Sequence, residues 1–275
     1  MTNNVYVLIN DLLLPADEAS LMISDLSIQR GYGIFDFFKT VQGKPVFLDD
    51  HLDRFYYSAS QMHLTVKKSR KDLKGLLYSL IRENNMPDSG IRITLTGGYS
   101  ADGFNIADPN LIVIQQSFNI NKDFAIKGIR LITYPYQRQL SHVKTLDYLM
   151  AIWLQPVIKE NNVDDVLYHQ NGIVAECPRA NFFIVTADDC VVTPANNILK
   201  GITRKHVLKI AGELFVAEER EVSLEDIKQA KEAFITSTTK NILPVVEIDG
   251  NILGDGKPGT FTQSLSRELE SLVYR

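Results

Sequence analysis

The sequence predicts an α+β fold, and three observations lead to that prediction. Strand-like runs follow one another across short polar turns, and Asn171-Gly172, between two of them, is the strongest short hairpin signal. Longer segments elsewhere repeat apolar residues at helical spacing. Strands that pair as hairpins, with helices interspersed among them, favour an α+β arrangement over a doubly wound parallel sheet.

Two hairpins are expected near the N-terminus. Residues 5–14 read as an extended segment in which Asn10-Asp11 forms a hairpin-type turn between two apolar stretches. Residues 34–40 are rich in Phe and β-branched side chains, which favours a strand. The Gly- and Pro-containing residues 42–45 then turn the chain into a second short strand at 46–48.

Two helices and two strands complete this half of the chain. The first helix is expected to begin at Asp49-Asp50, which are candidate caps, and the second to run from about Lys71 and end before Pro87. Strands are expected at 91–95 and 111–114. The apolar stripes of the two helices consist of Leu52, Phe55, Ala59 and Met62, and of Leu73, Leu77, Leu80 and Ile81.

Residues 116–123 are polar and lack a clear period. We interpret them as a linker between an N-terminal α+β domain, residues 1–115, and a C-terminal α+β domain, residues 124–275. The second domain is expected to open with a strand at 129–133 and a helix at 146–161. Its other expected elements are strands at 165–168, 173–176 and 182–185, a helix at 203–215, and strands at 233–236 and 243–246.

The composition is that of an ordinary globular protein. Apolar residues make up 45% of the 275 residues and charged residues 23%, which excludes wholesale disorder, collagen-like repeats and disulfide scaffolds. A formal net charge of -4 offers no overall attraction for nucleic acid or an anionic membrane, so neither is expected as a partner. The first seven residues do not have the pattern of a signal peptide, and no apolar run approaches the ~20 residues of a membrane span. We therefore expect a soluble, cytoplasmic protein, and the two cysteines, Cys177 and Cys190, are consistent with that compartment.

Most familiar motifs are absent. The segment from Gly31 to Asp36 lacks the third glycine of a dinucleotide-binding loop, and the sequence contains no GxxxxGK[ST] phosphate loop and no GxSxG nucleophile elbow. None of the five histidines has Cys or carboxylate residues at metal-ligand spacing, so no metal is expected.

Three segments are candidate anion sites. Residues 201–204 open a helix, where free backbone N–H groups attract anions, although a plain Gly turn with a Thr cap explains them equally well. Residues 236–239 are four hydroxyl residues directly after a strand, and they are either a phosphate cradle or an ordinary polar turn. Arg54 lies beside an apolar helical stripe, where it either meets an anion or extends to the surface.

Two more charged residues stand out. Lys144 has apolar residues near it on both sides, and a lysine partly withdrawn from water can attack a carbonyl to form a Schiff base. Most lysines do no such chemistry. Glu176 lies in an otherwise apolar strand, which requires a partner or an exposed face. The residues alone thus give candidate anion sites, a candidate nucleophile and an acid.

Six motifs in a fixed order connect these residues to a known family. The motifs are Ser24-Asp25 followed by Gly31-Tyr32-Gly33-Ile34-Phe35-Asp36; His51-Leu52-Asp53-Arg54-Phe55; Lys144-Thr145-Leu146-Asp147-Tyr148; Val174-Ala175-Glu176 through Asn181-Phe182-Phe183; Leu199-Lys200-Gly201-Ile202-Thr203-Arg204; and Ser237-Thr238-Thr239. The sequence resembles the class IV (fold type IV) pyridoxal-phosphate aminotransferases over nearly its whole length. That group contains branched-chain aminotransferase, D-amino acid aminotransferase and aminodeoxychorismate lyase.

The resemblance implies a fold, a cofactor and a role for each motif. It implies two α+β domains with pyridoxal 5'-phosphate between them, the cofactor lysine in the C-terminal domain, and a homodimer. By resemblance, Lys144 holds the cofactor as a Schiff base and moves the substrate α-proton, and Glu176 bonds to the pyridine nitrogen. The implied phosphate ligands are Arg54, the amides of Ile202 and Thr203, and Thr238, with Ser237 as an addition.

The implied reaction is ping-pong transfer of an amino group between an amino acid and a 2-oxo acid, with branched-chain substrates favoured slightly. An acid at Asp36 is typical of the transaminases rather than the lyases, and residues 95–99 lack an arginine that D-amino acid aminotransferases place there. Aminodeoxychorismate lyase, D-amino acid aminotransferase and a non-catalytic binding module remain the alternatives. The candidate substrate residues are Phe35, Tyr99, Phe104, Arg138 and Thr239.

Overall fold

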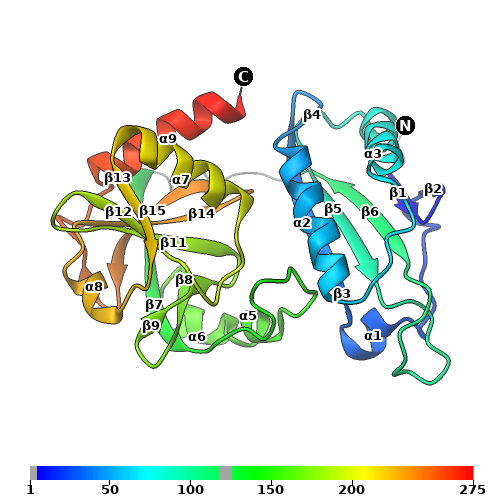
Figure 1. Cartoon of the computed structure of the whole chain (residues 1–275), viewed down its shortest axis with the longest axis horizontal. Helices are drawn as coiled ribbons and strands as arrows, with labels where there is room; N and C mark the ends of the chain where they lie inside the picture. Colours follow the sequence, from blue (N-terminus) through cyan, green and yellow to red (C-terminus); the bar gives the residue numbers. More distant parts are fainter. Residues whose placement is uncertain (1–4, 118–125, 275) are drawn as a thin grey trace. The chain divides into compact units, whose positions relative to one another are not determined.

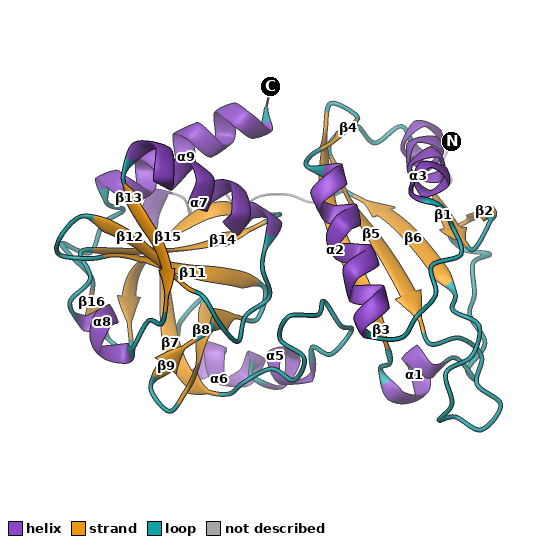
Figure 2. Ribbon diagram, viewed as in Figure 1, coloured by secondary structure: helices purple, strands orange, loops and turns teal. Residues whose placement is uncertain are grey.

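A computed structural model describes residues 5–117 and 126–274. The chain forms two compact units, one made of Met1–Asn119 with Val143–Asp147 and the other of Ile120–His142 with Tyr148–Arg275. Most of the expected linker, residues 118–123, lies outside the described residues, as do residues 1–4. Each unit combines a sheet with helices, so the chain has the mixed α+β fold that the sequence predicts (Figures 1 and 2).

The first unit contains a six-stranded antiparallel sheet in the order β2-β1-β6-β5-β3-β4. Its strands are β1 (Tyr6–Ile9), β2 (Leu12–Pro15), β3 (Gly33–Val41), β4 (Lys44–Pro45), β5 (Ser89–Thr96) and β6 (Leu111–Gln116). The hairpin at Asn10-Asp11 is confirmed, and Asn10 adopts the left-handed conformation that its tight turn requires. A short helix, α1 (Leu26–Arg30), was not predicted; the side chain of Asp25 caps its first turn.

Two longer helices pack on this sheet, α2 (Leu48–Gln61) and α3 (Arg70–Asn84). Both apolar stripes that the sequence predicts are buried in one core with Ile34 and Phe38 of β3. Figure 1 shows α2 crossing the face of β3 and β5. The expected strand at 46–48 is wrong: β4 ends at Pro45, and the chain turns at Val46-Phe47 into α2 because Leu48 is buried as the first residue of that helix.

The second unit is built on a curled sheet of ten described strands. Its main order is β13-β12-β11-β14-β15-β7-β8-β9, with β10 paired to β11 and β16 to β15. The strands are β7 (Ile129–Pro135), β8 (Asp165–Gln170), β9 (Ile173–Val174), β10 (Glu176–Cys177), β11 (Ala180–Val185), β12 (Cys190–Pro194), β13 (Val216–Arg220), β14 (Glu232–Ser237), β15 (Asn241–Ile248) and β16 (Asn251–Ile252). The hairpin at Asn171-Gly172 is confirmed, with both residues at positive φ.

Of the two helices that the sequence predicts in this unit, one is divided and the other is confirmed. The expected helix at 146–161 is instead two short helices, α5 (Leu149–Trp153) and α6 (Gln155–Glu160), because Pro156 lacks the N–H that a continuous helix needs there. α7 (Ile202–Leu214) confirms the helix expected at 203–215. Figure 2 shows α7 and α9 (Thr260–Val273) beside β14, which they contact.

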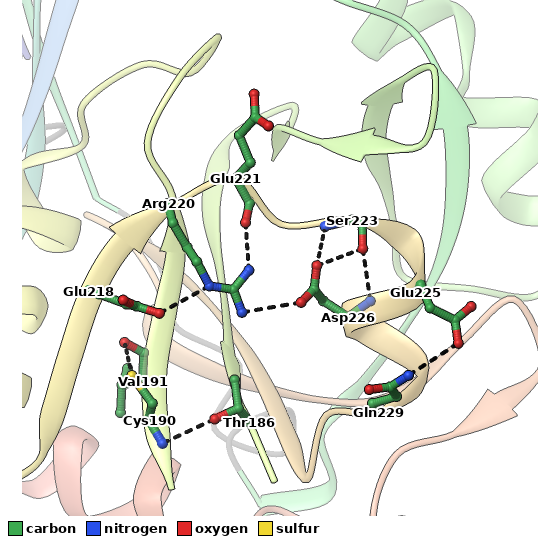
Figure 3. A network of polar contacts seen from close by, with 10 residues as sticks. All are labelled: Thr186, Cys190, Val191, Glu218, Arg220, Glu221, Ser223, Glu225, Asp226 and Gln229. Atoms are coloured by element: carbon green, nitrogen blue, oxygen red, sulfur yellow. Dashed lines mark hydrogen bonds and ion pairs between the residues drawn. The ribbon is translucent and has the colours of Figure 1, made fainter. Parts of the chain in front are cut away.

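A polar network fixes the connection between β13 and α8 (Leu224–Lys228). Arg220 donates hydrogen bonds to Glu218 at 3.0 Å and to Asp226 at 3.1 Å, and Ser223 and Asp226 form a capping box at the start of α8 (Figure 3). Cys190 lies at the edge of this network, and both cysteines are free thiols. In the part of the chain that the structure describes, no helix is long and apolar enough to cross a membrane.

Candidate active site

The segment that carries Lys144 belongs to the first unit although it lies in the second half of the chain. It runs along the free edge of β3: the N–H of Phe35 donates to the carbonyl of Lys144, and the N–H of Leu146 donates to the carbonyl of Gly33, each at 3.0 Å. Residue 33 must be glycine because a Cβ there would lie 2.7 Å from the carbonyl oxygen of Leu95. The resemblance implies a cofactor lysine in the C-terminal domain, residues 124–275, and this strand pairing is why residues 143–147 group with the first unit by their contacts.

The amine of Lys144 lies over an aromatic ring. Its Nζ is 4.5 Å from the centroid of the Phe35 ring, and the guanidinium carbon of Arg92 is 3.7 Å from the same centroid. Phe35 itself is buried. The Phe35 side chain lies on the face of the sheet opposite to α2, and the Lys144 amine and the Arg92 guanidinium both lie over its ring.

A buried carboxylate on the other face of β3 holds Arg54. Asp36 is fully buried, and Arg54 donates from Nε to Oδ2 and from Nη2 to Oδ1, each at 2.8 Å. His51, one turn earlier in α2, lies with Nδ1 2.7 Å from Oδ1. An ionised carboxylate only accepts hydrogen bonds, so Nδ1 carries the proton. Burial would raise the pKa of Asp36, but the charges and hydrogen bonds of Arg54 and His51 outweigh it and hold that pKa well below its usual range.

The Asp36 carboxylate leaves one side of the Arg54 guanidinium available. The side chain of Arg54 is 10% exposed, and its Nη1 has no hydrogen-bond partner among residues 5–117 and 126–274. A guanidinium whose inner edge is fixed by a carboxylate can offer its outer N–H groups to an anion. Of the two alternatives that the sequence left open for Arg54, the structure shows contact with an anion, and that anion is the Asp36 carboxylate.

In the second unit, Glu176 is buried and accepts hydrogen bonds from Arg138, Asn181 and Leu199. Arg138 donates from Nε to Oε1 at 3.1 Å, while Asn181 Nδ2 and the N–H of Leu199 donate to Oε2 at 3.2 and 3.0 Å. The Arg138 guanidinium is also bonded to the carbonyl of Ser141 at 2.8 Å. Glu176 thus has the partner that a carboxylate in an apolar strand requires.

The start of α7 lies beside this carboxylate. Gly201 is the residue that precedes the helix, and no side chain caps it. Thr203 is a residue of the first turn rather than a cap, and both Ile202 and Thr203 are buried. The free N–H groups of this first turn are the feature that makes a helix N-terminus attract anions.

The hydroxyl segment forms the tip of the hairpin between β14 and β15. Ser237 ends β14, Thr238 and Thr239 are in the turn, and the Ser237 hydroxyl accepts from the N–H of Lys240 at 3.2 Å. Thr236 pairs across the sheet with Asn181, which in turn pairs with Glu176, so these side chains point to one face. The buried hydroxyl of Thr236 has no hydrogen-bond partner among the described residues.

The structure does not gather every candidate substrate residue. Tyr99 pairs with Asp25 in an isolated bridge, and Phe104 is 81% exposed, so Phe104 lines no apolar pocket within the described chain. The sequence analysis missed Arg92 and Asn181. Arg92 had a visible signal, because it is a charge within the apolar strand at 91–95, the same argument that selected Glu176.

Comparison with known proteins gives the class to which this fold and these residues belong. The family model for amino-transferase class IV matches residues 33–248. D-alanine aminotransferase of Listeria monocytogenes serotype 4b is 30% identical over 276 residues, which cover 94% of this chain and 93% of that protein.

Solved structures give the same fold. Branched-chain amino acid aminotransferase of Escherichia coli superposes with a TM-score of 0.92 at 22% identity, covering 98% of this chain and 95% of that one. A putative 4-amino-4-deoxychorismate lyase of Legionella pneumophila gives 0.85 at 25% identity, covering 94% and 97%.

This chain belongs to the class IV aminotransferase family, whose enzymes depend on pyridoxal 5'-phosphate. In the described residues, no group of three or more His, Cys, Asp or Glu side chains could hold a metal ion.

Proposed function

We propose that this chain moves an amino group from an amino acid to a 2-oxo acid in two half-reactions, with pyridoxal phosphate as its cofactor. The observation that carries the proposal is the position of Lys144. Its main chain is bonded to the edge of β3, so that its amine lies over the Phe35 ring rather than at the end of a free loop. A reactive amine must be held in place for proton transfer at a substrate carbon.

The donors and acceptors present fit pyridoxal phosphate. An amine at Lys144 suits its aldehyde, a buried carboxylate at Glu176 suits a protonated ring nitrogen, and an uncommitted guanidinium edge at Arg54 suits its phosphate. The buried hydroxyl of Thr236, without a partner among the described residues, is a further polar group on the Glu176 face. Pyridoxal phosphate, when bound, supplies the aldehyde that exchanges amino groups and the ring that withdraws electrons from the reacting carbon.

The chain's own groups bind, orient and move a proton. We assign to the Lys144 amine the transfer of the proton at the substrate α-carbon, and to Glu176 the holding of a proton at the ring nitrogen. Arg54, the N–H groups of Ile202 and Thr203, and Thr238 with Ser237 are assigned to the phosphate. A helix N-terminus and a guanidinium both stabilise a phosphate dianion, and together they fix its orientation.

The structure leads us to transfer the proposed substrate-carboxylate role from Arg138 to Arg92. The Arg138 guanidinium is bonded to Glu176 and Ser141, so we assign it to holding that carboxylate. Arg92 shares the Phe35 ring with the Lys144 amine, and a guanidinium close to the reactive amine is suited to a substrate carboxylate. Phe35 then offers an apolar surface to the substrate side chain.

Two substrate classes follow from different observations. The Phe35 ring and the absence of an arginine in residues 95–99 support branched-chain amino acids. The relatives at 30% identity whose names specify D-alanine support D-alanine. By the family resemblance, an acid at Asp36 is typical of the transaminases rather than the lyases, which supports either transaminase.

The test is the first half-reaction, followed by absorbance. Purified protein loaded with pyridoxal phosphate should show a band near the visible edge, which Lys144→Ala should abolish. L-leucine or D-alanine, added without an acceptor, should bleach this band, and 2-oxoglutarate should restore it. If neither amino acid bleaches it and only aminodeoxychorismate is consumed, the aminotransferase proposal fails.

We also propose a homodimer. The short helix α5 exposes Leu149, Ile152 and Trp153, a cluster of large apolar side chains of the kind that a protein contact covers. Light scattering on the purified protein should give twice the chain mass of 31.0 kDa. A mass of one chain at micromolar concentration would contradict this proposal.

A further inference from the structure

We infer that Asn181 is a positioning residue that ties the Glu176 carboxylate to the start of α7. This inference rests on the proposed function, in which these two features bind opposite ends of pyridoxal phosphate. All of the contacts that carry it lie within the second unit. Asn181 belongs to the sequence motif that also contains Glu176.

Asn181 uses both of its N–H donors. It is the second residue of β11 and is buried, and its Nδ2 donates to Glu176 Oε2 at 3.2 Å and to the carbonyl of Leu199 at 2.7 Å. The N–H of Leu199 donates to the same Glu176 oxygen at 3.0 Å. Asn181, Glu176 five residues before it and Leu199 18 residues after it thus close a triangle of hydrogen bonds. An amide nitrogen has two hydrogens to donate, so this side of Asn181 is saturated.

The amide oxygen of Asn181 packs against Gly201. A Cβ built on Gly201 would lie 2.1 Å from Asn181 Oδ1, far inside van der Waals contact. Gly201 has φ -67°, a conformation open to every residue, so space rather than backbone freedom requires glycine here. Because Gly201 directly precedes α7, this contact sets where the first helical N–H groups lie relative to the β11 strand.

The two ends of the amide therefore give Asn181 a coupling role. Glu176 and the α7 N–H groups must bind one rigid ligand at two points, and a shift of either point spoils the fit of both. Asn181 is not among the groups that we assign to the cofactor. It acts through Glu176, Leu199 and Gly201, which makes it a positioning residue rather than a catalytic one.

The first test compares two substitutions at residue 181 by titrating apoprotein with pyridoxal phosphate. Asn181→Ala removes the donors and leaves a cavity. Asn181→Asp keeps the size of the side chain but places a second carboxylate beside Glu176. We expect the dissociation constant to rise about tenfold for Asn181→Ala and more for Asn181→Asp. A side chain that only filled space would give the reverse order, and dissociation constants equal to that of the unchanged protein would overturn the inference.

The second test is a double-mutant cycle with Gly201→Ala. Alone, this substitution should push the Asn181 amide away and weaken cofactor binding about as much as Asn181→Ala. In the double variant, the alanine at 181 makes room for the new methyl group, so binding should be no weaker than in Asn181→Ala. If the losses of cofactor affinity in the two single variants multiplied in the double variant, the two residues would act independently, and the inference would be overturned.

A matched control uses a glycine inside α7. Gly212 has nothing within 4 Å of its Cβ position, so Gly212→Ala should bind the cofactor as the unchanged protein does. The thermal midpoint of each apoprotein checks that every variant folds. If the unchanged protein gives no saturable absorbance band with pyridoxal phosphate, the proposed function itself fails. If that band forms and requires Lys144 while the 181 variants bind normally, only this inference fails.

Discussion

Arg54 donates two hydrogen bonds of 2.8 Å to the fully buried carboxylate of Asp36. The pair joins α2 to β3, and His51 adds a third donor from α2. A guanidinium held in this way keeps one direction, so its remaining N–H groups point to a fixed place. The proposed phosphate site depends on that orientation.

Breaking this pair should cost far more stability than breaking an exposed pair on the same helix. Asp36→Asn removes the charge that compensates Arg54, and we expect the free energy of unfolding to fall by about 3 kcal/mol. The matched control is Asp53→Asn, since Asp53 is 65% exposed and pairs with Arg70 at the surface. That control should cost less than about 1 kcal/mol. Urea unfolding of the apoproteins measures the free energy of unfolding of both variants. Equal losses for Asp36→Asn and Asp53→Asn would show that the buried pair is no more important for stability than the exposed one.

His51 should make the stability depend on pH. Burial lowers the pKa of His51 below its ordinary 6.5, Arg54 and Lys144 lower it further, and Asp36 opposes them. The unfolded chain therefore takes up a proton before the folded one does, so stability is complete above about pH 6.5 and decreases as the pH falls below that value. The depressed pKa of Asp36 acts in the same direction, but only below about pH 4.

The pH effect is checked by thermal unfolding from about pH 7.5 to about pH 5. His51→Asn keeps an N–H donor near the Nδ1 position but cannot titrate, so its thermal midpoint should vary less over this interval. His63→Asn is the control, because His63 is exposed and already in the left-handed conformation that Asn tolerates. A His51→Asn curve parallel to that of the unchanged protein would show that His51 is not the responsible group.

Arg138 should affect the cofactor rather than the substrate. Arg138→Met removes the donor to Glu176 Oε1 but keeps much of the side-chain volume. We expect the dissociation constant of pyridoxal phosphate to rise about tenfold, with little change in KM for the 2-oxo acid at saturating cofactor. If Arg138 instead bound the substrate carboxylate, KM would rise and cofactor binding would stay the same. Steady-state kinetics and the absorbance titration separate these two outcomes.

The loop that follows β5 should tolerate no side chain at Gly98. This residue has φ +80°, and a Cβ there would lie 2.1 Å from the carbonyl oxygen of Asp108. Gly43 has nearly the same φ, +77°, with nothing within 4 Å. Gly43→Ala should therefore cost about 1 kcal/mol of stability for the backbone alone, and Gly98→Ala clearly more. If urea unfolding gave the same loss of stability for Gly43→Ala and Gly98→Ala, the loop at Asp108 would be free to move away from the new methyl group.

The sequence determined the local elements of this protein well. Apolar periodicity located α2, α3 and α7, and the Asn-Asp and Asn-Gly turns located two hairpins, because these signals act within a few residues. The six motifs also gave the family and its cofactor. Where the local signal was ambiguous, it failed: residues 46–48 are apolar enough for a strand, yet they lead into α2, and Pro156 divides a stretch with helical spacing.

Only the tertiary structure decided which side chains meet. Arg54 was recognised as a guanidinium in need of an anion, but the sequence could not show that Asp36, 18 residues earlier, supplies it. Lys144 joins the first unit because its backbone pairs with β3, and Asn181 matters because its amide fills the space that Gly201 leaves open. Such contacts depend on register and close packing between distant segments, and no local pattern in one chain records them.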